Sequence, residues 1–377
     1  MRRWPALIAI AAMCAGLSAN AQQQPAALAT YARLDPGQVT VSGISSGGFF
    51  AHQLHVAHSG LITGAAVLAG GPYGCAEQVP IALSLTPYAS VIVALGTCAR
   101  SGRVFPWTLV LPEQPSAEAA LALIRAEHAA GRIDDPANLR DDRVWLFTGA
   151  NDEVVPVSTM QVLEASYRGL GLAPPALRFV RDGDANHGVP IEQFTGTSTF
   201  PPRACDQYGP PFLIDCDFDA AGRLLQHLYP TGFAGPAIPA RAHLLAFDQT
   251  EFFDPGVASI SLAETGYVYV PAACQDDAPP GAACRLHVAF HGCQQSAQMV
   301  DDDFVWDAGY NGFAEANRIV VLYPQTTTFE RWWDVTGLAG NPKGCWDWWG
   351  YSGTDYYVQS GGQIRAVRAM IDRLLAD

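Results

Sequence analysis

Short apolar runs alternate along the chain with amphipathic stretches, and glycine or polar residues separate them. Runs rich in β-branched and apolar residues predict strands over 38–42, 61–68, 143–148, 176–181, 266–271, 285–290 and 319–323. Longer stretches with one polar face predict helices over 49–58, 117–130, 157–168, 306–317 and 363–375. We expect the strands 266–271 and 285–290 to be adjacent. Strands that alternate with helices indicate an α/β fold, a mainly parallel sheet with helices on both faces.

The first residues follow a different pattern, that of a secretory signal. Arg2 and Arg3 precede an apolar run over 6–17, and the small residues Ala19 and Ala21 predict cleavage after Ala21. That run is too short for a membrane-spanning helix, and no later stretch is long and apolar enough. We therefore expect a signal peptide over residues 1–21, a single catalytic domain over 22–377 without an appended binding module, and secretion to the periplasm or the medium.

Eight cysteines remain after the expected cleavage site, and an even number in an exported chain indicates disulfides. Many pairings are compatible with the sequence. Short loops favour Cys75–Cys98, Cys205–Cys216 and Cys274–Cys284, and elimination leaves Cys293–Cys345. Because cysteine and histidine spacings typical of zinc are missing, we expect no metal, and we expect no cofactor.

The charge of the chain narrows the range of partners. The formal net charge is −14, and Lys343 is the only lysine. An acidic surface argues against nucleic acid, anionic membranes and anionic substrates, so a neutral or hydrophobic substrate fits better. We expect a monomer with neither a nucleic-acid nor a membrane partner.

A candidate nucleophile follows the first predicted strand. The segment Gly43-Ile44-Ser45-Ser46-Gly47 matches G-x-S-x-G between a strand and a helix, the context that a nucleophile elbow requires. Ser46 is the competing nucleophile, but Ile44 stands where a glycine is needed. The alternative is a glycine-rich turn without catalysis. The pattern favours Ser45.

A serine nucleophile needs a base, and the base needs an acid that orients it. Asp152 lies just past the predicted strand 143–148, and His187 lies in a loop of small residues after the strand 176–181. Ser45, Asp152 and His187 follow the chain order of α/β-hydrolases. Glu153 is a less favourable acid, because the exit from the strand favours the earlier position. A helix-capping aspartate and an exposed loop histidine are the structural alternatives.

The tetrahedral intermediate needs two N–H donors. The amide of Ser46 is one candidate, because it follows the nucleophile. The other donor normally comes from a His-Gly loop that precedes the nucleophile, but here such a strand and loop lie at 286–293, with Cys293 as the candidate donor. A plain buried strand is the alternative. This order predicts a circularly permuted α/β-hydrolase, in which joining Asp377 to the start of the mature chain would restore the usual order.

Five segments occur together in one order: GISSGG, GANDEVVP, a His-Gly loop, FHGCQQS and NPKGCWDWWGY. In this combination the chain resembles the single-domain, circularly permuted poly(3-hydroxybutyrate) depolymerases over most of its mature length. The resemblance implies the same triad and the same two oxyanion donors. It also implies that Asn341 and Trp346 line the substrate crevice, because the spacing Asn-x-x-Gly-Cys-Trp matches that of the family.

The resemblance implies a serine esterase that acts on a polyester polymer or oligomer through an acyl-enzyme. A cluster of aromatic residues fits that substrate, because aromatic faces pack on alkyl ester chains, and we expect roughly half of them to be buried. The cluster consists of Trp332, Trp333, Trp346, Trp348, Trp349 and Tyr351. Two alternatives remain: a secreted feruloyl or acetyl esterase acting on plant polysaccharide, and a non-catalytic polymer-binding protein.

Overall fold

The structure is a computed structural model of the chain. It describes residues 25–31, 33–79, 88–99, 114–192, 200–279, 281–331, 334 and 339–376. The expected signal peptide, Trp332 and Trp333 lie outside the described residues, and the signal peptide stays a prediction. Within the described ranges, no helix is long and apolar enough to cross a membrane.

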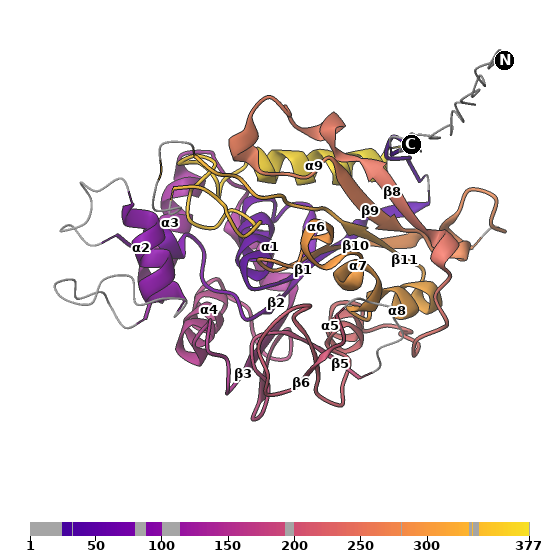
Figure 1. The fold of residues 1–377 in the computed structure, drawn as a ribbon, viewed down its shortest axis with the longest axis horizontal. Helices are drawn as coiled ribbons and strands as arrows, with labels where there is room; N and C mark the ends of the chain where they lie inside the picture. Colours follow the sequence, from indigo (N-terminus) through magenta and orange to yellow (C-terminus); the bar gives the residue numbers. More distant parts are fainter. Residues whose placement is uncertain are drawn as a thin grey trace, which may run out of the picture.

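An eight-stranded sheet runs through the centre of the molecule in the order β4-β3-β2-β1-β10-β11-β9-β8 (Figure 1). Its strands are β1 (Leu34–Ile44), β2 (Ile62–Leu68), β3 (Arg143–Gly149), β4 (Leu177–Asp182), β8 (Leu244–Asp248), β9 (Thr265–Tyr269), β10 (Cys284–Phe290) and β11 (Ile319–Tyr323). The six strands from β4 to β11 pair in parallel, while β9 and β8 pair antiparallel at one edge. The predicted mainly parallel sheet is confirmed.

Both faces of the sheet are apolar, because successive residues of a strand point to opposite sides. In β2, for example, Ala65 and Val67 belong to one hydrophobic core, and Ala66 and Leu68 belong to the other. One core is covered by α1 (Ser46–Ala57), α3 (Ala117–Ala129), α4 (Val157–Gly169) and α9 (Gly362–Leu375), and the other by α5 (Ala220–Leu228), α7 (Asp303–Asp307) and α8 (Tyr310–Asn317). Figure 1 shows α9 and α8 on opposite sides of the sheet.

Shorter elements connect these layers. A small parallel sheet has the order β5-β7-β6, formed by β5 (Val189–Ile191), β7 (Leu213–Asp215) and β6 (Arg203–Ala204). Two short helices are α2 (Ala89–Val93) and α6 (Ala297–Val300). Helical turns lie at Cys75–Glu77, Ala94–Cys98, Pro136–Asp141, Arg241–His243, Gln249–Phe252, Ala258–Ile260 and Ala272–Cys274.

Two predictions about arrangement were wrong, and four strands were not predicted. The strands β9 and β10 are not adjacent, because the helical crossover from β10 places β11 next to it in parallel. The helix expected over 306–317 is two helices, since Gly309 adopts a positive φ of 88° between α7 and α8. The edge strand β8 and the three strands of the small sheet, β5, β6 and β7, had no counterpart in the prediction.

The four disulfides join the pairs that loop length and elimination favoured. They are Cys75–Cys98, Cys205–Cys216, Cys274–Cys284 and Cys293–Cys345. The last one joins the loop after β10 to the irregular segment that precedes α9, across 52 positions of sequence. It therefore connects two segments that approach each other only in the folded chain.

Candidate active site

Ser45 stands in the sharp turn between β1 and α1, with φ 56° and ψ −124°. A non-glycine residue with positive φ is strained, and such strain persists only where the surroundings hold it. The glycines two positions before and after Ser45 have no room for a side chain. A Cβ on Gly43 would lie 2.2 Å from the carbonyl oxygen of Gly47, and a Cβ on Gly47 would lie 2.4 Å from that of His291. The turn therefore has the shape and the small neighbours of a nucleophile elbow.

His187 and Asp152 follow two neighbouring parallel strands, β4 and β3, and their side chains meet. His187 Nδ1 lies 2.9 Å from Asp152 Oδ2, and the two side chains are 6% and 1% exposed. The other carboxylate oxygen accepts the backbone N–H groups of Val154 at 2.8 Å and Val155 at 2.7 Å. These bonds fix the carboxylate, which in turn orients the imidazole, the arrangement that a triad histidine requires. Glu153 is exposed at the rim of the neighbouring cavity.

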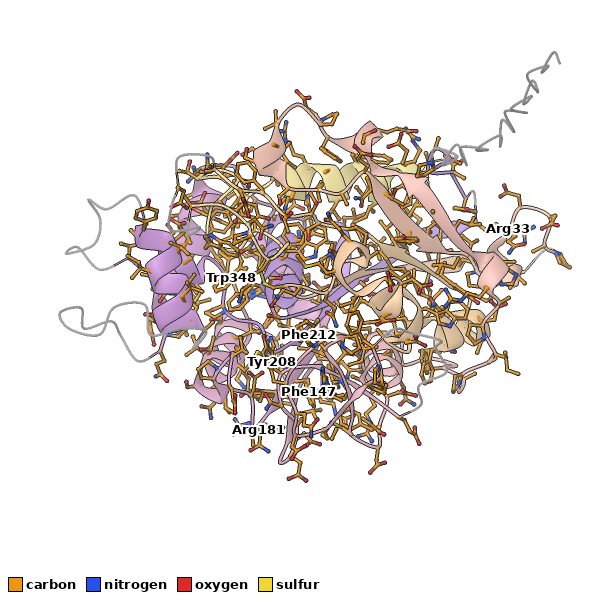
Figure 2. The ribbon with its side chains drawn as sticks, viewed as in Figure 1. Arg33, Phe147, Arg181, Tyr208, Phe212 and Trp348 are labelled. Carbon is orange, nitrogen blue, oxygen red and sulfur yellow. A yellow bond between two sulfur atoms is a disulfide. The ribbon has the colours of Figure 1, made fainter. Side chains whose placement is uncertain are left out.

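Ser45 and His187 both line a cavity of about 470 Å³. This volume lies in the range of small-molecule sites. Much of the remaining lining is apolar, and it includes Val91, Leu95, Val154, Phe212 and Trp348. Tyr208, Phe212 and Trp348, which are labelled in Figure 2, all line the cavity, and the first two rings are 5.4 Å apart. The cavity suits an uncharged ligand with alkyl groups.

The two predicted oxyanion donors belong to segments that adjoin Ser45. Ser46 is the first residue of α1, and amides in the first turn of a helix lack acceptors within that helix. Because β10 pairs in parallel with β1, the loop after β10 emerges at the same edge of the sheet as Ser45. A Cβ on Gly292 would lie only 3.4 Å from the Cβ of Ser45, and Cys293 lines the cavity. The fold thus brings together two segments almost 250 residues apart in sequence.

Asn341 lines the cavity, but its side chain is fully buried and serves the loop around it. Its Nδ2 donates to the carbonyl oxygen of Cys345 at 2.8 Å and to Ser261 Oγ at 3.0 Å. Its Oδ1 accepts the backbone N–H of Cys345 at 2.8 Å. These bonds support the wall of the cavity and place the half-cystine that bonds to Cys293.

Trp346 is fully buried and lies behind the cavity wall, where it packs on Phe50 and Phe290 at ring separations of 4.6 and 4.9 Å. The tryptophans in the wall itself are Trp348 and Trp349. Trp348 stacks on Phe49 with the ring centroids 4.1 Å apart and the planes at 14°. Of the four described members of the aromatic cluster, Trp346, Trp348 and Tyr351 are buried and Trp349 is partly exposed.

Sequence reasoning missed the loop closed by Cys205–Cys216, which supplies Tyr208 and Phe212 to the cavity. Tyr208 lies beside His187 at a ring separation of 6.0 Å and is 46% exposed. The only signal in the sequence was the short disulfide loop itself, because loop residues that face a site follow no periodic pattern.

Another buried histidine, His287, has a structural role beneath the nucleophile strand. Its two ring nitrogens lie 2.7 Å from Thr40 Oγ1 and Ser42 Oγ, and Ser42 Oγ also bonds to Tyr310 at 2.8 Å. Burial lowers the pKa of His287 to about 3, so its ring is neutral at pH 7. This satisfied network holds β1 against β10.

Two curated proteins are similar in sequence to most of this chain. The chain is 37% identical over 344 residues to the poly(3-hydroxybutyrate) depolymerase of Delftia acidovorans, and the aligned region covers 91% of this chain and 60% of that protein. It is 30% identical over 347 residues to the polyhydroxybutyrate depolymerase of Talaromyces funiculosus, and the aligned region covers 91% of both proteins. The chain belongs to the poly(3-hydroxybutyrate) depolymerase family. No family model matches the chain.

Solved structures agree with this assignment to the depolymerase family. A PHB depolymerase from Penicillium funiculosum matches with a TM-score of 0.75 and 29% identity, over 93% of this chain and 99% of that one. A serine-to-alanine PHB depolymerase complexed with an R3HB trimer matches with the same TM-score and 28% identity, over the same shares. The chain spans 60% of the length of its Delftia relative, so the two do not correspond throughout.

Proposed function

We propose that this protein is a secreted serine esterase that hydrolyses poly(3-hydroxybutyrate) or a similar short-chain polyhydroxyalkanoate. The observation that carries the proposal is one cavity lined by an elbow serine, Ser45, by a histidine bonded to a buried carboxylate, His187, and by aromatic side chains. The family relatives bear the corresponding names. Four disulfides support export, since such bonds persist in oxidising compartments.

The reaction follows from the roles of the side chains. Ser45 Oγ attacks the ester carbonyl while His187 Nε2 takes the serine proton, and Asp152 stabilises the resulting imidazolium. The carbonyl oxygen becomes an oxyanion that accepts the N–H groups of Ser46 and Cys293. When the intermediate collapses, the alcohol end of the chain leaves with the proton from His187.

Deacylation repeats these steps with water. His187 removes a proton from water, the hydroxide attacks the acyl group on Ser45, and the hydroxyalkanoate acid leaves as the serine recovers its proton. All the residues in this cycle come from one chain, so the mechanism requires no partner subunit.

The aromatic part of the wall supports the choice of substrate. A polyester of short hydroxy acids carries no charge along its chain and presents a methyl group and a methylene at each repeat. Trp348, stacked on Phe49, and Phe212 present apolar faces to such groups. The acidic character of the protein would disfavour a polyanionic polymer, but it does not disfavour a neutral one.

Clearing of a polymer suspension tests the proposal. We expect the protein to clear a suspension of amorphous poly(3-hydroxybutyrate) and to release hydroxybutyrate or its short oligomers, as measured by chromatography. Ser45→Ala should lose roughly 10⁴-fold or more of this activity and keep its affinity for polymer film, while the exposed control Ser360→Ala should match the wild type.

Three results would contradict parts of this proposal. Release of hydroxybutyrate by Ser45→Ala would refute the mechanism. Rapid release of ferulate or acetate from plant polysaccharide by a protein inert toward polyester would refute the substrate. Binding of polymer without hydrolysis by the wild type would mark a non-catalytic protein.

A further inference from the structure

The proposed esterase mechanism needs the N–H of Cys293 to point at the oxyanion, and the residue before it is a glycine. Glycine restricts the backbone least of all residues, so the peptide that joins Gly292 to Cys293 could rotate unless other groups hold it. The loop that contains it lies between β10 and α6, outside regular secondary structure. Something other than a backbone ladder must therefore set its orientation.

Two side chains hold the two peptide groups of Gly292. The carbonyl oxygen of Gly292 accepts from His291 Nδ1 at 2.7 Å, while His291 Nε2 accepts the backbone N–H of Thr326 at 3.2 Å. Burial lowers the pKa of His291 to about 4, which agrees with a neutral ring carrying its proton on Nδ1. Because a trans peptide is planar, fixing the Gly292 carbonyl also fixes the Cys293 N–H, which points the opposite way.

The preceding peptide is held by Gln295. Its Oε1 accepts the N–H of Gly292 at 2.8 Å, and its Nε2 donates to the carbonyl oxygens of Pro211 and Phe212 at 3.0 and 3.3 Å. Gln295 is 1% exposed, so water cannot readily replace these partners. A side-chain amide can satisfy this set in one orientation only, with its oxygen toward the N–H and its nitrogen toward the carbonyls.

The loop that receives the Gln295 amide also supports the catalytic histidine. Asn186, next to His187, donates from its backbone N–H to the carbonyl oxygen of Cys205 at 2.8 Å and from Nδ2 to that of Asp206 at 3.0 Å. The Cys205–Cys216 disulfide closes this loop. One loop therefore contacts both the histidine side and the oxyanion side of the site.

We propose that Gln295 is a positioning residue for the oxyanion hole. Its Oε1 accepts the N–H of Gly292 and so holds the Gly292–Cys293 segment. Its Nε2 donates to Pro211 and Phe212 and so fixes that segment against the disulfide-closed loop beside His187. Gln295 itself does not touch the reacting atoms in this proposal. Its contribution appears in the transition state, when the carbonyl oxygen gains negative charge and the Cys293 N–H must already point at it.

The test compares Gln295→Ala and Gln295→Glu with the wild type on p-nitrophenyl butyrate, a soluble ester. We expect kcat to fall about 10- to 100-fold in Gln295→Ala while KM changes less than about threefold, because the lost interaction matters in the transition state. Gln295→Glu keeps an oxygen for Gly292 but places a carboxylate against two carbonyls, so its kcat should also fall. The matched control is Gln298→Ala, an exposed glutamine on α6, which should keep the wild-type kcat.

A second measurement separates positioning from general loss of structure. The rate constant for inactivation by a phosphonate ester, which forms a charged adduct on Ser45, should fall by a factor similar to that in kcat. Thermal unfolding of each variant gives the folded fraction at the assay temperature, and rates are expressed per folded protein.

The outcomes distinguish this inference from the proposed function on which it rests. A wild-type protein that hydrolyses no ester would refute the proposed function. An active wild type with unchanged kcat in both Gln295 variants, or with a rise in KM alone, would refute only the positioning role. Equal losses in the variants and in Gln298→Ala would also refute it.

Discussion

The aromatic wall of the cavity depends on one buried carboxylate, Asp347, which is 1% exposed. Its Oδ1 accepts the backbone N–H groups of Trp349, Gly350 and Tyr351 at 3.2, 2.7 and 3.2 Å. Its Oδ2 accepts the N–H of Ser352 at 2.8 Å and the hydroxyl of the same residue at 2.5 Å. Burial raises the pKa of Asp347, and the hydrogen bonds oppose that shift. Removing this carboxylate should therefore loosen the segment that carries Trp348 and Trp349.

The magnitude of the effect of Asp347→Ala follows from these bonds. A hydrogen bond to a charged group contributes about 1.5–3 kcal/mol, but the five bonds share one acceptor group and do not add. The variant also avoids the cost of burying the charge, which offsets part of the loss. We expect a loss of about 3–5 kcal/mol in the free energy of unfolding. At about 2.1 cal/mol/K per residue, a domain of about 350 residues has an unfolding entropy of about 0.75 kcal/mol/K, so this loss corresponds to a fall in Tm of roughly 4–7 °C.

Calorimetry and kinetics together test this prediction. Asp347→Ala should raise KM for a hydroxybutyrate trimer about fivefold or more, since the trimer needs the positioned wall, and should change KM for p-nitrophenyl acetate much less. Asp347→Asn keeps one oxygen acceptor and should fall between the wild type and the alanine variant. The control Asp372→Ala removes an exposed aspartate paired with Arg368 and should alter Tm by about 2 °C or less. An unchanged Tm with an unchanged trimer KM would refute the reasoning.

Three further predictions address other parts of the molecule. Asp152→Asn should lower kcat about 10³- to 10⁴-fold with little change in KM, and normal kcat in steady-state assays would rule out Asp152 as the orienting acid. Trp348→Ala removes the ring stacked on Phe49 and should raise KM for the trimer about 5- to 10-fold, whereas an unaltered KM would exclude the ring from substrate binding. Burial, with Asp303 nearby, raises the pKa of Asp307 to about 6. The folded state therefore favours the protonated carboxyl, and the stability of the fold is highest below about pH 4 and falls as the pH rises through 6 and Asp307 ionises. The free energy of unfolding of Asp307→Asn, measured with urea, should therefore be about 1–2 kcal/mol higher than that of the wild type at pH 8 and equal to it at pH 4. An equal difference at both pH values would contradict this.

Much of the fold was predictable because burial imposes a period on the sequence. The strand predicted over 319–323 is β11, and the strand and helix around Ser45 begin and end within a few residues of their predicted bounds. The order of strands was less accessible, because a period says which face of a strand is buried and not which strand lies beside it. The circularly permuted order stays a prediction, and the pairing of β10 with β1 is what it requires.

Part of the active-site chemistry could likewise be predicted from the sequence, and part required the folded structure. The sequence alone determined the residue types that a serine esterase needs, Ser45, Asp152 and His187, because each follows a strand and parallel strands end at one edge of a sheet. Their catalytic roles stay predictions until the variants are measured. The contact between His187 and Asp152, by contrast, is a fact of the folded chain.

Only the tertiary structure decided which loop residues face the cavity. Residues 339–352 have no regular backbone, so no period separates Trp346, which lies behind the wall, from Trp348, which lies in it. That choice depends on the hydrogen bonds around Asp347 and Asn341. The same holds for Gln295, whose partners lie more than 80 residues earlier in the chain as well as three residues away. Local patterns encode burial, but side-chain hydrogen bonds between distant loops form only once the sheet has brought those loops together.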